Sequence, residues 1–224
     1  EDSRFMVVFP SGLFNTWNTG PNMNYSHEVD DNSYFDALID NIDDNYPLDT
    51  NRVYLTGHSM GGFMASHMNC TSTSFAAYAG SGGGVYSGYF PNNAYNELCS
   101  IENGTYPNPM IISHGIGDAT VPYEHAIFNL YNFLLLNRCN GATSWPYDYS
   151  WVGFYEIGVF WDDPGDDFDD ITDIVYGKAD TLEHTGLIHR YQWSNGCLGN
   201  SPALEAIILP YEGHAWHQTW NSPI

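Results

Sequence analysis

The chain has 224 residues, of which 43% are hydrophobic, enough to form the core of one large domain or two small ones. Five Lys and Arg residues face 27 Asp and Glu residues, which gives a formal net charge of -22. This acidity excludes nucleic acid as a partner and disfavours anionic membranes. No apolar run approaches the roughly 20 residues of a membrane span. The first residues lack the basic start of a signal peptide, which a mature secreted protein would already have lost.

In chain order, the sequence predicts a strand at 5–9, a helix at 30–46, a strand at 52–56, a helix at 61–69, strands at 75–81 and 109–115, a helix at 123–136 and a strand at 205–210. The strands are short apolar runs, and the helices carry apolar residues at spacings of three and four. Asp30 offers a helix start and Pro47 a helix stop. This alternation predicts a mostly parallel sheet with helices on both faces.

One segment breaks this alternation. Trp145–Trp161 contains eight aromatic residues, and the acidic run Asp162–Asp170 follows it. We interpret the region at about 143–185 as an insertion in a single domain, 1–224. It could form a lid or a platform for a hydrophobic polymer, or pack as extra core or a dimer contact. The acidic run does not match the spacing of an EF-hand loop, which favours a solvated loop over a calcium site.

Cysteine usage predicts an oxidising compartment. Cys70, Cys99, Cys139 and Cys197 form no CxxC pair and stand at no zinc-finger spacing from a histidine. An even, scattered set of this kind suggests two disulfides. Of the three possible connectivities we favour Cys70–Cys99 with Cys139–Cys197. Four buried thiols in a cytosolic enzyme are the alternative.

The segment Gly57-His58-Ser59-Met60-Gly61 lies between a predicted strand and a predicted helix. This is the context that a G-x-S-x-G nucleophile elbow requires. Side chains at Gly57 and Gly61 would collide with neighbouring backbone, so we expect both positions to need glycine. The Met60 N–H, at the helix start, would donate to a developing oxyanion. An inert serine in a glycine-rich turn is the alternative.

A nucleophilic serine needs a base, and the base needs an orienting carboxylate. In this fold the partners follow later strands in the order acid, then histidine. Asp118 follows the strand at 109–115 and is the predicted acid. His214 follows the strand at 205–210 and is the predicted base, with His217 as its main rival.

Four other histidines are weaker candidates for the base. His58 lies inside the elbow, on the wrong side of Ser59. His67 and His125 fall within predicted helices, where packing or surface roles are more common. His114 precedes Asp118 at the same strand end and could line the pocket.

Several motifs stand in the order and spacing of a known family: FMVVFPSG with NTW, VDDNSYFDALIDNI, TNRVYLTGHSMGGFMASHM, MIISHGIGDATVPY and EGHAWH. Over most of its length, the chain resembles the secreted polyhydroxybutyrate depolymerase and feruloyl esterase family of α/β-hydrolases. The resemblance implies an α/β-hydrolase fold, an acyl-enzyme mechanism and no metal or cofactor. It implies ester substrates of the hydroxyalkanoate or hydroxycinnamate type, including polymers for some members.

The resemblance also implies roles for single residues. Trp17 and Trp216 fall in motifs that border the family's active site, where both could stack on the substrate; core packing is the alternative. His58 joins them as a candidate substrate-binding residue. Cys139 and Cys197 match a disulfide position of the family.

The sequence departs from the family in two ways. The family normally has strands ahead of 5–9, including a His-Gly loop that gives the first oxyanion N–H. This sequence starts too late to contain them, either because it is a fragment or because the enzyme is naturally shortened and uses another donor. Residues 11–14 are the nearest candidate loop for that donor. His217 stands where the family often has proline.

These observations predict a secreted serine esterase. A serine peptidase on the same fold and a non-catalytic binding protein on a hydrolase scaffold are the rival interpretations.

Overall fold

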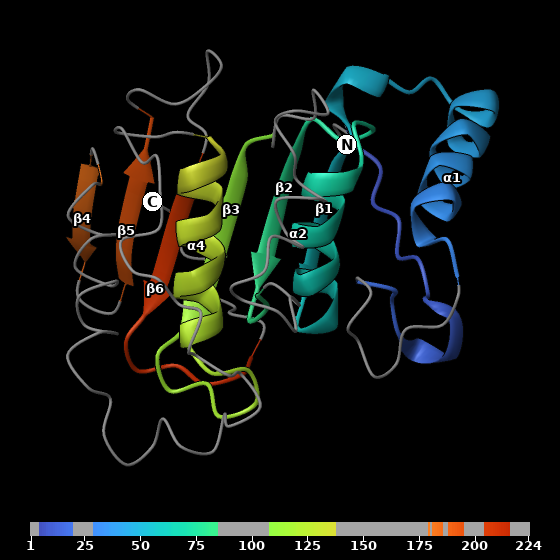
Figure 1. Ribbon diagram of the computed structural model, residues 1–224. Helices are drawn as coiled ribbons and strands as arrows, with labels where there is room; N and C mark the ends of the chain where they lie inside the picture. The colour runs from blue at the N-terminus through green and yellow to red at the C-terminus, as the bar shows by residue number, and fades with distance from the viewer. Residues whose placement is uncertain are drawn as a thin grey trace.

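The computed structural model describes residues 5–19, 29–84, 108–137, 179, 181–185, 188–194 and 204–215. A six-stranded sheet with the order β1-β2-β3-β6-β5-β4 runs through it (Figure 1). The strands are β1 (Tyr54–His58), β2 (Ala77–Ser81), β3 (Met110–Gly115), β4 (Thr181–Thr185), β5 (Ile188–Trp193) and β6 (Leu204–Leu209). The first four in the order are parallel neighbours, whereas β5 and β4 extend the sheet in an antiparallel manner.

The α-helices are α1 (Asp31–Asn45), α2 (Met60–Thr71) and α4 (Glu124–Leu136), with short 3-10 helices η1 (Leu13–Asn15) and η2 (Thr50–Arg52). α2 packs on β1 and β2, and α4 packs on β3 and β6. Figure 1 shows α2 and α4 in front of the sheet and α1 beyond its β1 edge. A mostly parallel sheet with helices packed on it confirms the predicted α/β-hydrolase fold class. Because α2 and α4 lie on the same face, coverage of the second face stays a prediction.

Local sequence explains where α1 begins and ends. The Asp30 carboxylate caps the helix by accepting the Ser33 N–H at 3.0 Å, which satisfies one of the first unpaired amides. The helix ends at Asn45, and Pro47 follows after an extended Tyr46. The predicted helix at 30–46 is therefore confirmed to within one residue at each end.

The core lies between the sheet and the two helices that cover it. Its fully buried side chains come from α2, α4, β3, β5 and β6: Met64, Met68, Ile112, Ile127, Leu130, Phe133, Leu134, Trp193, Leu204 and Ile208. The apolar face predicted for the helix at 123–136 is the one that α4 buries. Removing this much apolar surface from water provides the main driving force for the fold.

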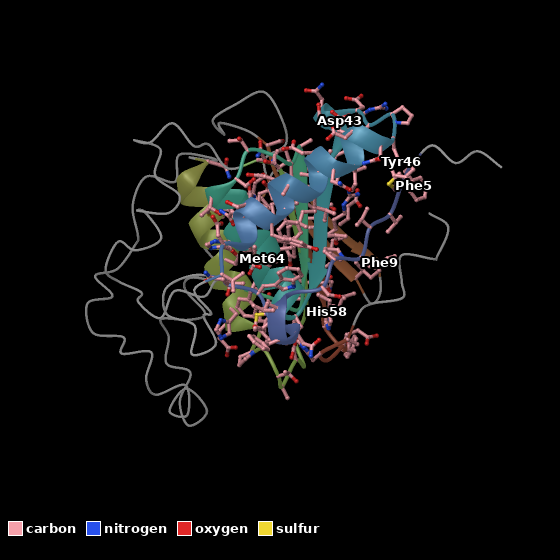
Figure 2. The ribbon with its side chains drawn as sticks, turned by 90° about the vertical axis from the view of Figure 1, so that its right-hand side faces the viewer. Phe5, Phe9, Asp43, Tyr46, His58 and Met64 are labelled. Carbon is pink, nitrogen blue, oxygen red and sulfur yellow. The ribbon has the colours of Figure 1, made fainter. Side chains whose placement is uncertain are left out.

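The predicted strand at 5–9 is wrong. These residues form neither helix nor strand, and Phe5 and Phe9 are 82% and 89% exposed. Figure 2 shows both rings on the outside of the ribbon. A continuous apolar run is typical of a strand with neighbours on both sides. Among the described residues, β1 is the last strand at this edge of the sheet, and no other strand pairs with 5–9.

The antiparallel extension was not predicted from sequence. β5 pairs with β6 so that Gln192 lies opposite Glu205. Glu205 accepts from Arg190 at 2.7 and 3.0 Å and from the Gln192 amide at 2.8 Å. β5 contains polar and charged residues because it is joined to β6 partly by the Arg190–Glu205 ion pair. These residues obscure the apolar pattern by which a strand is predicted.

Other sequence predictions are only partly covered by the described residues. Cys70 is buried and disulfide-bonded. Its predicted partner Cys99, together with Cys139 and Cys197, lies outside the described residues, so the two pairings stay predictions. The same holds for most of the aromatic and acidic insertion, of which β4 is a described part. No helix in the described part of the chain has the length and apolar character to cross a membrane.

A matched pair of phenylalanine substitutions tests the division between core and surface. Phe133→Ala removes a ring that is 0% exposed on α4, and it should lower the free energy of unfolding by about 3–5 kcal/mol. Phe9→Ala removes an 89% exposed ring and should change it by less than about 0.5 kcal/mol. Urea denaturation of both variants measures the difference. Equal losses would mean that the segment 5–9 is buried after all.

Candidate active site

Ser59 sits in a strained turn between β1 and α2. Its φ of 54° and ψ of -118° are rare for a residue with a side chain. The turn is held by hydrogen bonds from the Ser59 N–H to the Ser81 carbonyl and from the Gly62 N–H to the Ser59 carbonyl, both at 2.8 Å. Strain of this kind persists only where the surrounding structure enforces it, and here it presents the serine at the carboxyl edge of the sheet.

Close backbone packing explains one glycine of the elbow but not the other. A Cβ on Gly57 would lie 2.3 Å from the backbone of Gly61, so only glycine fits. A Cβ on Gly61 would meet no atom within 4 Å. The expectation that both positions need glycine is therefore wrong for Gly61. Its backbone blocks a side chain at position 57, but nothing blocks a side chain at position 61 itself.

The structure brings Ser59, His214 and Asp118 together. His214 Nε2 lies 2.9 Å from Ser59 Oγ, and His214 Nδ1 lies 2.7 Å from Asp118 Oδ2. The serine follows β1, the aspartate follows β3 and the histidine follows β6. Because these strands are parallel, their carboxyl ends meet at one edge, at the bottom of the view in Figure 1.

Two loops hold the aspartate and the histidine side by side. The Gly117 N–H donates to the Glu212 carbonyl at 3.0 Å, and the Ile116 N–H donates to the Leu209 carbonyl at 3.1 Å. A Cβ on Gly115 would lie 2.3 Å from the Glu212 oxygen, so this crossing also requires glycine. The loop after β3 is thus fixed to the loop after β6.

Asp118 is buried and ionised. Burial raises the pKa of its carboxyl group, but several favourable interactions outweigh that effect. The Val121 and Thr120 N–H groups donate to Oδ1 at 2.8 and 2.9 Å, and His214 donates to Oδ2. Together with the nearby His114, they hold the pKa of Asp118 below its ordinary value. The carboxylate is therefore present as the anion that an imidazolium partner needs.

His58 packs against the ring of His214. The two ring centroids are 4.8 Å apart with a tilt of 39°, and both rings lie over Gly82. A Cβ on Gly82 would be 2.9 Å from His58 Cε1 and 3.4 Å from His214 Nδ1, and the φ of Gly82 is +55°. Glycine here leaves room for both imidazoles. Sequence reasoning did not single out Gly82, whose only signal is its place in a run of glycines after β2.

The remaining predicted site residues have different environments. The Met60 N–H begins α2, where helix amides have no partner within the helix. The ring centroid of Trp17 lies 5.3 Å from that of Phe35 and 6.3 Å from that of Tyr34, so Trp17 packs against α1, as the core-packing alternative expects. Its stacking on a substrate stays a prediction. Trp216 and His217 lie outside the described residues, so their roles stay predictions. Residues 11–14 are described and lead into η1, but nothing tests them as a second oxyanion donor, so that role also stays a prediction.

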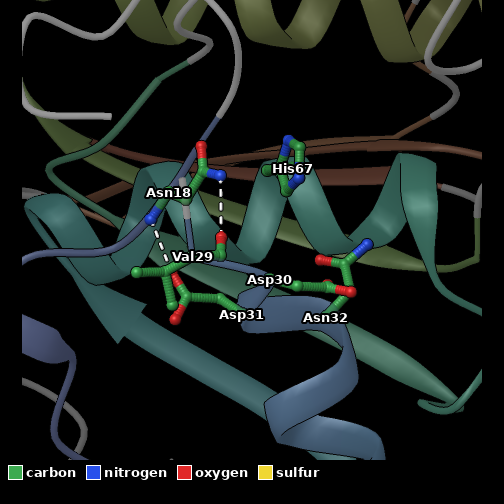
Figure 3. Close-up of a pocket in the computed structure, with 6 residues that line it drawn as sticks. All are labelled: Asn18, Val29, Asp30, Asp31, Asn32 and His67. Carbon is green, nitrogen blue, oxygen red and sulfur yellow. Dashed lines mark hydrogen bonds between the residues drawn. The ribbon is translucent and has the colours of Figure 1, made fainter. Parts of the chain in front are cut away.

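A separate polar cavity of about 340 Å³ contains none of the triad residues (Figure 3). Its lining residues are Asn18, Val29, Asp30, Asp31, Asn32 and His67. Asp31 accepts the Asn18 N–H at 2.6 Å, and burial lowers the pKa of His67 to about 4. Within the described ranges, no three His, Cys, Asp or Glu side chains gather as metal ligands.

Two alanine substitutions in the elbow test its packing. Gly57→Ala forces a backbone clash, so it should lower the free energy of unfolding by more than about 3 kcal/mol or abolish folding. Gly61→Ala fills open space in the first turn of α2 and should leave stability unchanged or raise it by about 0.5–1 kcal/mol. Thermal and urea unfolding measure both effects, and a Gly61 variant as unstable as the Gly57 variant would contradict the geometry.

Comparison with known proteins points to esterases. No family model matches the chain. It is 29% identical over 136 residues to a bifunctional acetylxylan esterase/xylanase of Neocallimastix patriciarum, covering 59% of this chain and 17% of that protein. It is 28% identical over 139 residues to a probable feruloyl esterase C of Aspergillus terreus, covering 61% of this chain and 44% of that protein. The chain thus spans less than half the length of either relative.

A solved structure of a thermostable esterase overlaps with 45% of this chain and 24% of its own, at 25% identity and a TM-score of 0.35. That overlap is too slight to carry an argument, so the fold assignment rests on the sheet topology. The two sequence matches show that the chain is a distant homologue of feruloyl esterase C and of acetylxylan esterase.

Proposed function

We propose that this chain is a secreted serine esterase that hydrolyses carboxylic esters through Ser59, His214 and Asp118. The observation that carries the proposal is the continuous hydrogen-bonded set from Ser59 Oγ through both nitrogens of His214 to Asp118 Oδ2. Distant homology to esterases independently suggests a carboxylic ester hydrolase.

The geometry supports the usual division of roles in such a triad. Ser59 Oγ attacks the ester carbonyl while His214 Nε2 takes its proton. The same nitrogen then gives that proton to the leaving alcohol, and an acyl group stays on Ser59. Asp118 keeps His214 Nδ1 protonated and stabilises the imidazolium that forms. Water next attacks the acyl-enzyme, with His214 again as base, and releases the acid and free Ser59.

Backbone amides at the start of α2 would stabilise the tetrahedral intermediates. The Met60 N–H follows the nucleophile directly, at the positive end of the helix dipole. Loss of one such donor typically costs about 3 kcal/mol of transition-state stabilisation. A second donor would therefore contribute a similar amount. We propose the backbone of residues 11–14 as its source.

The substrate class and the cellular location follow from weaker support. One relative is named as an acetylxylan esterase and the other as a feruloyl esterase, so we propose acetyl or hydroxycinnamoyl esters first and polyesters of hydroxyalkanoates second. A net charge of -22 favours uncharged esters over anionic ones. The disulfide at Cys70 supports secretion, because such bonds persist in oxidising compartments.

Replacement of the nucleophile tests this function. The intact protein should hydrolyse p-nitrophenyl acetate, and Ser59→Ala should lower kcat by about 10⁴- to 10⁶-fold, because no other group can form the acyl-enzyme. A phosphonate ester should label the wild type once, at Ser59. Ser74→Ala, which alters a hydroxyl bonded to Asp36 away from the triad, is the matched control and should retain full activity.

Comparing methyl ferulate, an acetylated xylo-oligosaccharide and a hydroxybutyrate oligomer would then rank the ester classes. A wild type that turns over peptides but no ester would overturn the proposal in favour of a peptidase. Absence of both turnover and labelling would instead favour a binding protein.

A further inference from the structure

A second imidazole, that of His114, lies next to the carboxylate of Asp118. His114 is near the end of β3 and is 0% exposed. Its Nε2 lies 2.8 Å from the Val121 carbonyl oxygen and 3.5 Å from Asp118 Oδ2. The mechanism above does not use this ring, although it contacts the same carboxylate oxygen as His214.

The hydrogen bond to Val121 fixes which nitrogen of His114 carries the proton. A carbonyl oxygen only accepts, so Nε2 must be the donor. Burial lowers the pKa of His114, which keeps the ring neutral even though the Val121 and Gly83 carbonyls and the Asp118 charge favour the protonated form. The ring therefore presents one N–H, aimed at Val121 and the edge of Asp118.

Val121 is held through both of its backbone groups. Its N–H donates to Asp118 Oδ1 at 2.8 Å, and its carbonyl accepts from His114. The loop that carries the acid is thus closed by its own carboxylate on one side and by the ring at the strand end on the other. Without the His114 donor, the Val121 carbonyl would be a buried acceptor without its partner, and the amide that orients Asp118 would be free to move.

We propose that His114 is a positioning residue for the triad, which holds Asp118 in its orientation toward His214 through Val121 and through the N–H that faces Oδ2. The inference rests on the proposed esterase function for its kinetic consequences but not for its structural ones.

The groups around this ring determine the expected pH dependence. Asp118 and His214 face it from the two loops, and Tyr123 (ring centroids 6.1 Å apart) and His125 lie at the α4 side. Burial lowers the pKa of His125 to about 4, so that ring is also neutral near pH 7. The Asp118 carboxylate is a charged group next to His114, and the N–H of the neutral His114 ring, 3.5 Å from Oδ2, favours the ionised form of Asp118.

Two substitutions separate the donor from the ring. His114→Leu removes the donor at similar volume, whereas His114→Gln replaces it with a side-chain amide of comparable reach. With p-nitrophenyl acetate, we expect His114→Leu to lower kcat by about 10²-fold with KM unchanged, as for a catalytic group moved by about 1 Å. As the pH is lowered, the kcat of His114→Leu should begin to fall at a higher pH than that of the wild type, because loss of the His114 N–H raises the pKa of Asp118. His114→Gln should recover most of kcat.

His67→Leu is the matched control. It removes another imidazole whose pKa burial lowers to about 4, from the polar cavity rather than from the triad. It should leave kcat and the pH profile unchanged. If His114→Leu behaves like His67→Leu, or if His114→Gln is as impaired as His114→Leu, the proposed role of His114 is wrong.

A measurement without substrate keeps the two proposals apart. The downfield proton NMR signal of His214 Nδ1–H, hydrogen-bonded to Asp118, should be sharp in the wild type and His114→Gln and broadened or absent in His114→Leu. This result would support the role of His114 even if the wild type hydrolysed no ester, which would overturn only the proposed function. An unchanged signal in His114→Leu would overturn the positioning role whatever the activity.

Discussion

The parallel pairing of β3 with β6 is the constraint on which the site depends. It aligns Gly115 with Leu209, so the two chains leave the sheet together. The loops then touch so closely that a single Cβ at Gly115 would clash with the Glu212 carbonyl. Asp118 and His214 therefore share one rigid platform, to which the elbow adds only the serine. The positions of the candidate triad side chains at this edge are therefore set by backbone packing between the loops.

The strong acidity of the chain does not decide the charge of the buried carboxylate. A formal charge of -22 would on its own favour protonation of any additional acid. Exposed charges are screened within about 10 Å, whereas hydrogen bonds from two backbone amides and an imidazole act on Asp118 at less than 3 Å. Local donors win over the distant field, so the pKa of Asp118 falls rather than rises. The surface charge therefore acts on solubility and on the approach of charged substrates rather than on the ionisation of Asp118.

Sequence reasoning succeeded where one local signal decided the outcome. Apolar periodicity placed α1 and α4, and start and stop signals also bounded α1. The strand–elbow–helix pattern placed Ser59 at the sheet edge that Asp118 and His214 also reach. It failed where the outcome depended on distant neighbours. The run at 5–9 has the composition of a buried strand but lies exposed, and β5 is held by the Arg190–Glu205 ion pair rather than by an apolar pattern. The Gly57–Gly61 contact likewise needed three-dimensional geometry, since both glycines look equivalent in the motif.

Exposure separates the two imidazoles that flank Asp118. The His214 side chain is 18% exposed, while that of His114 is 0% exposed. A general base must exchange protons with a substrate and with water, so it needs a face open to the site. A ring that only orients a carboxylate is better buried, because burial keeps it neutral and strengthens its hydrogen bonds. Oδ2 of Asp118 thus lies between the proposed general base, His214, and the proposed positioning residue, His114. If both proposals hold, the difference between the two histidines comes from their burial and not from their side-chain chemistry.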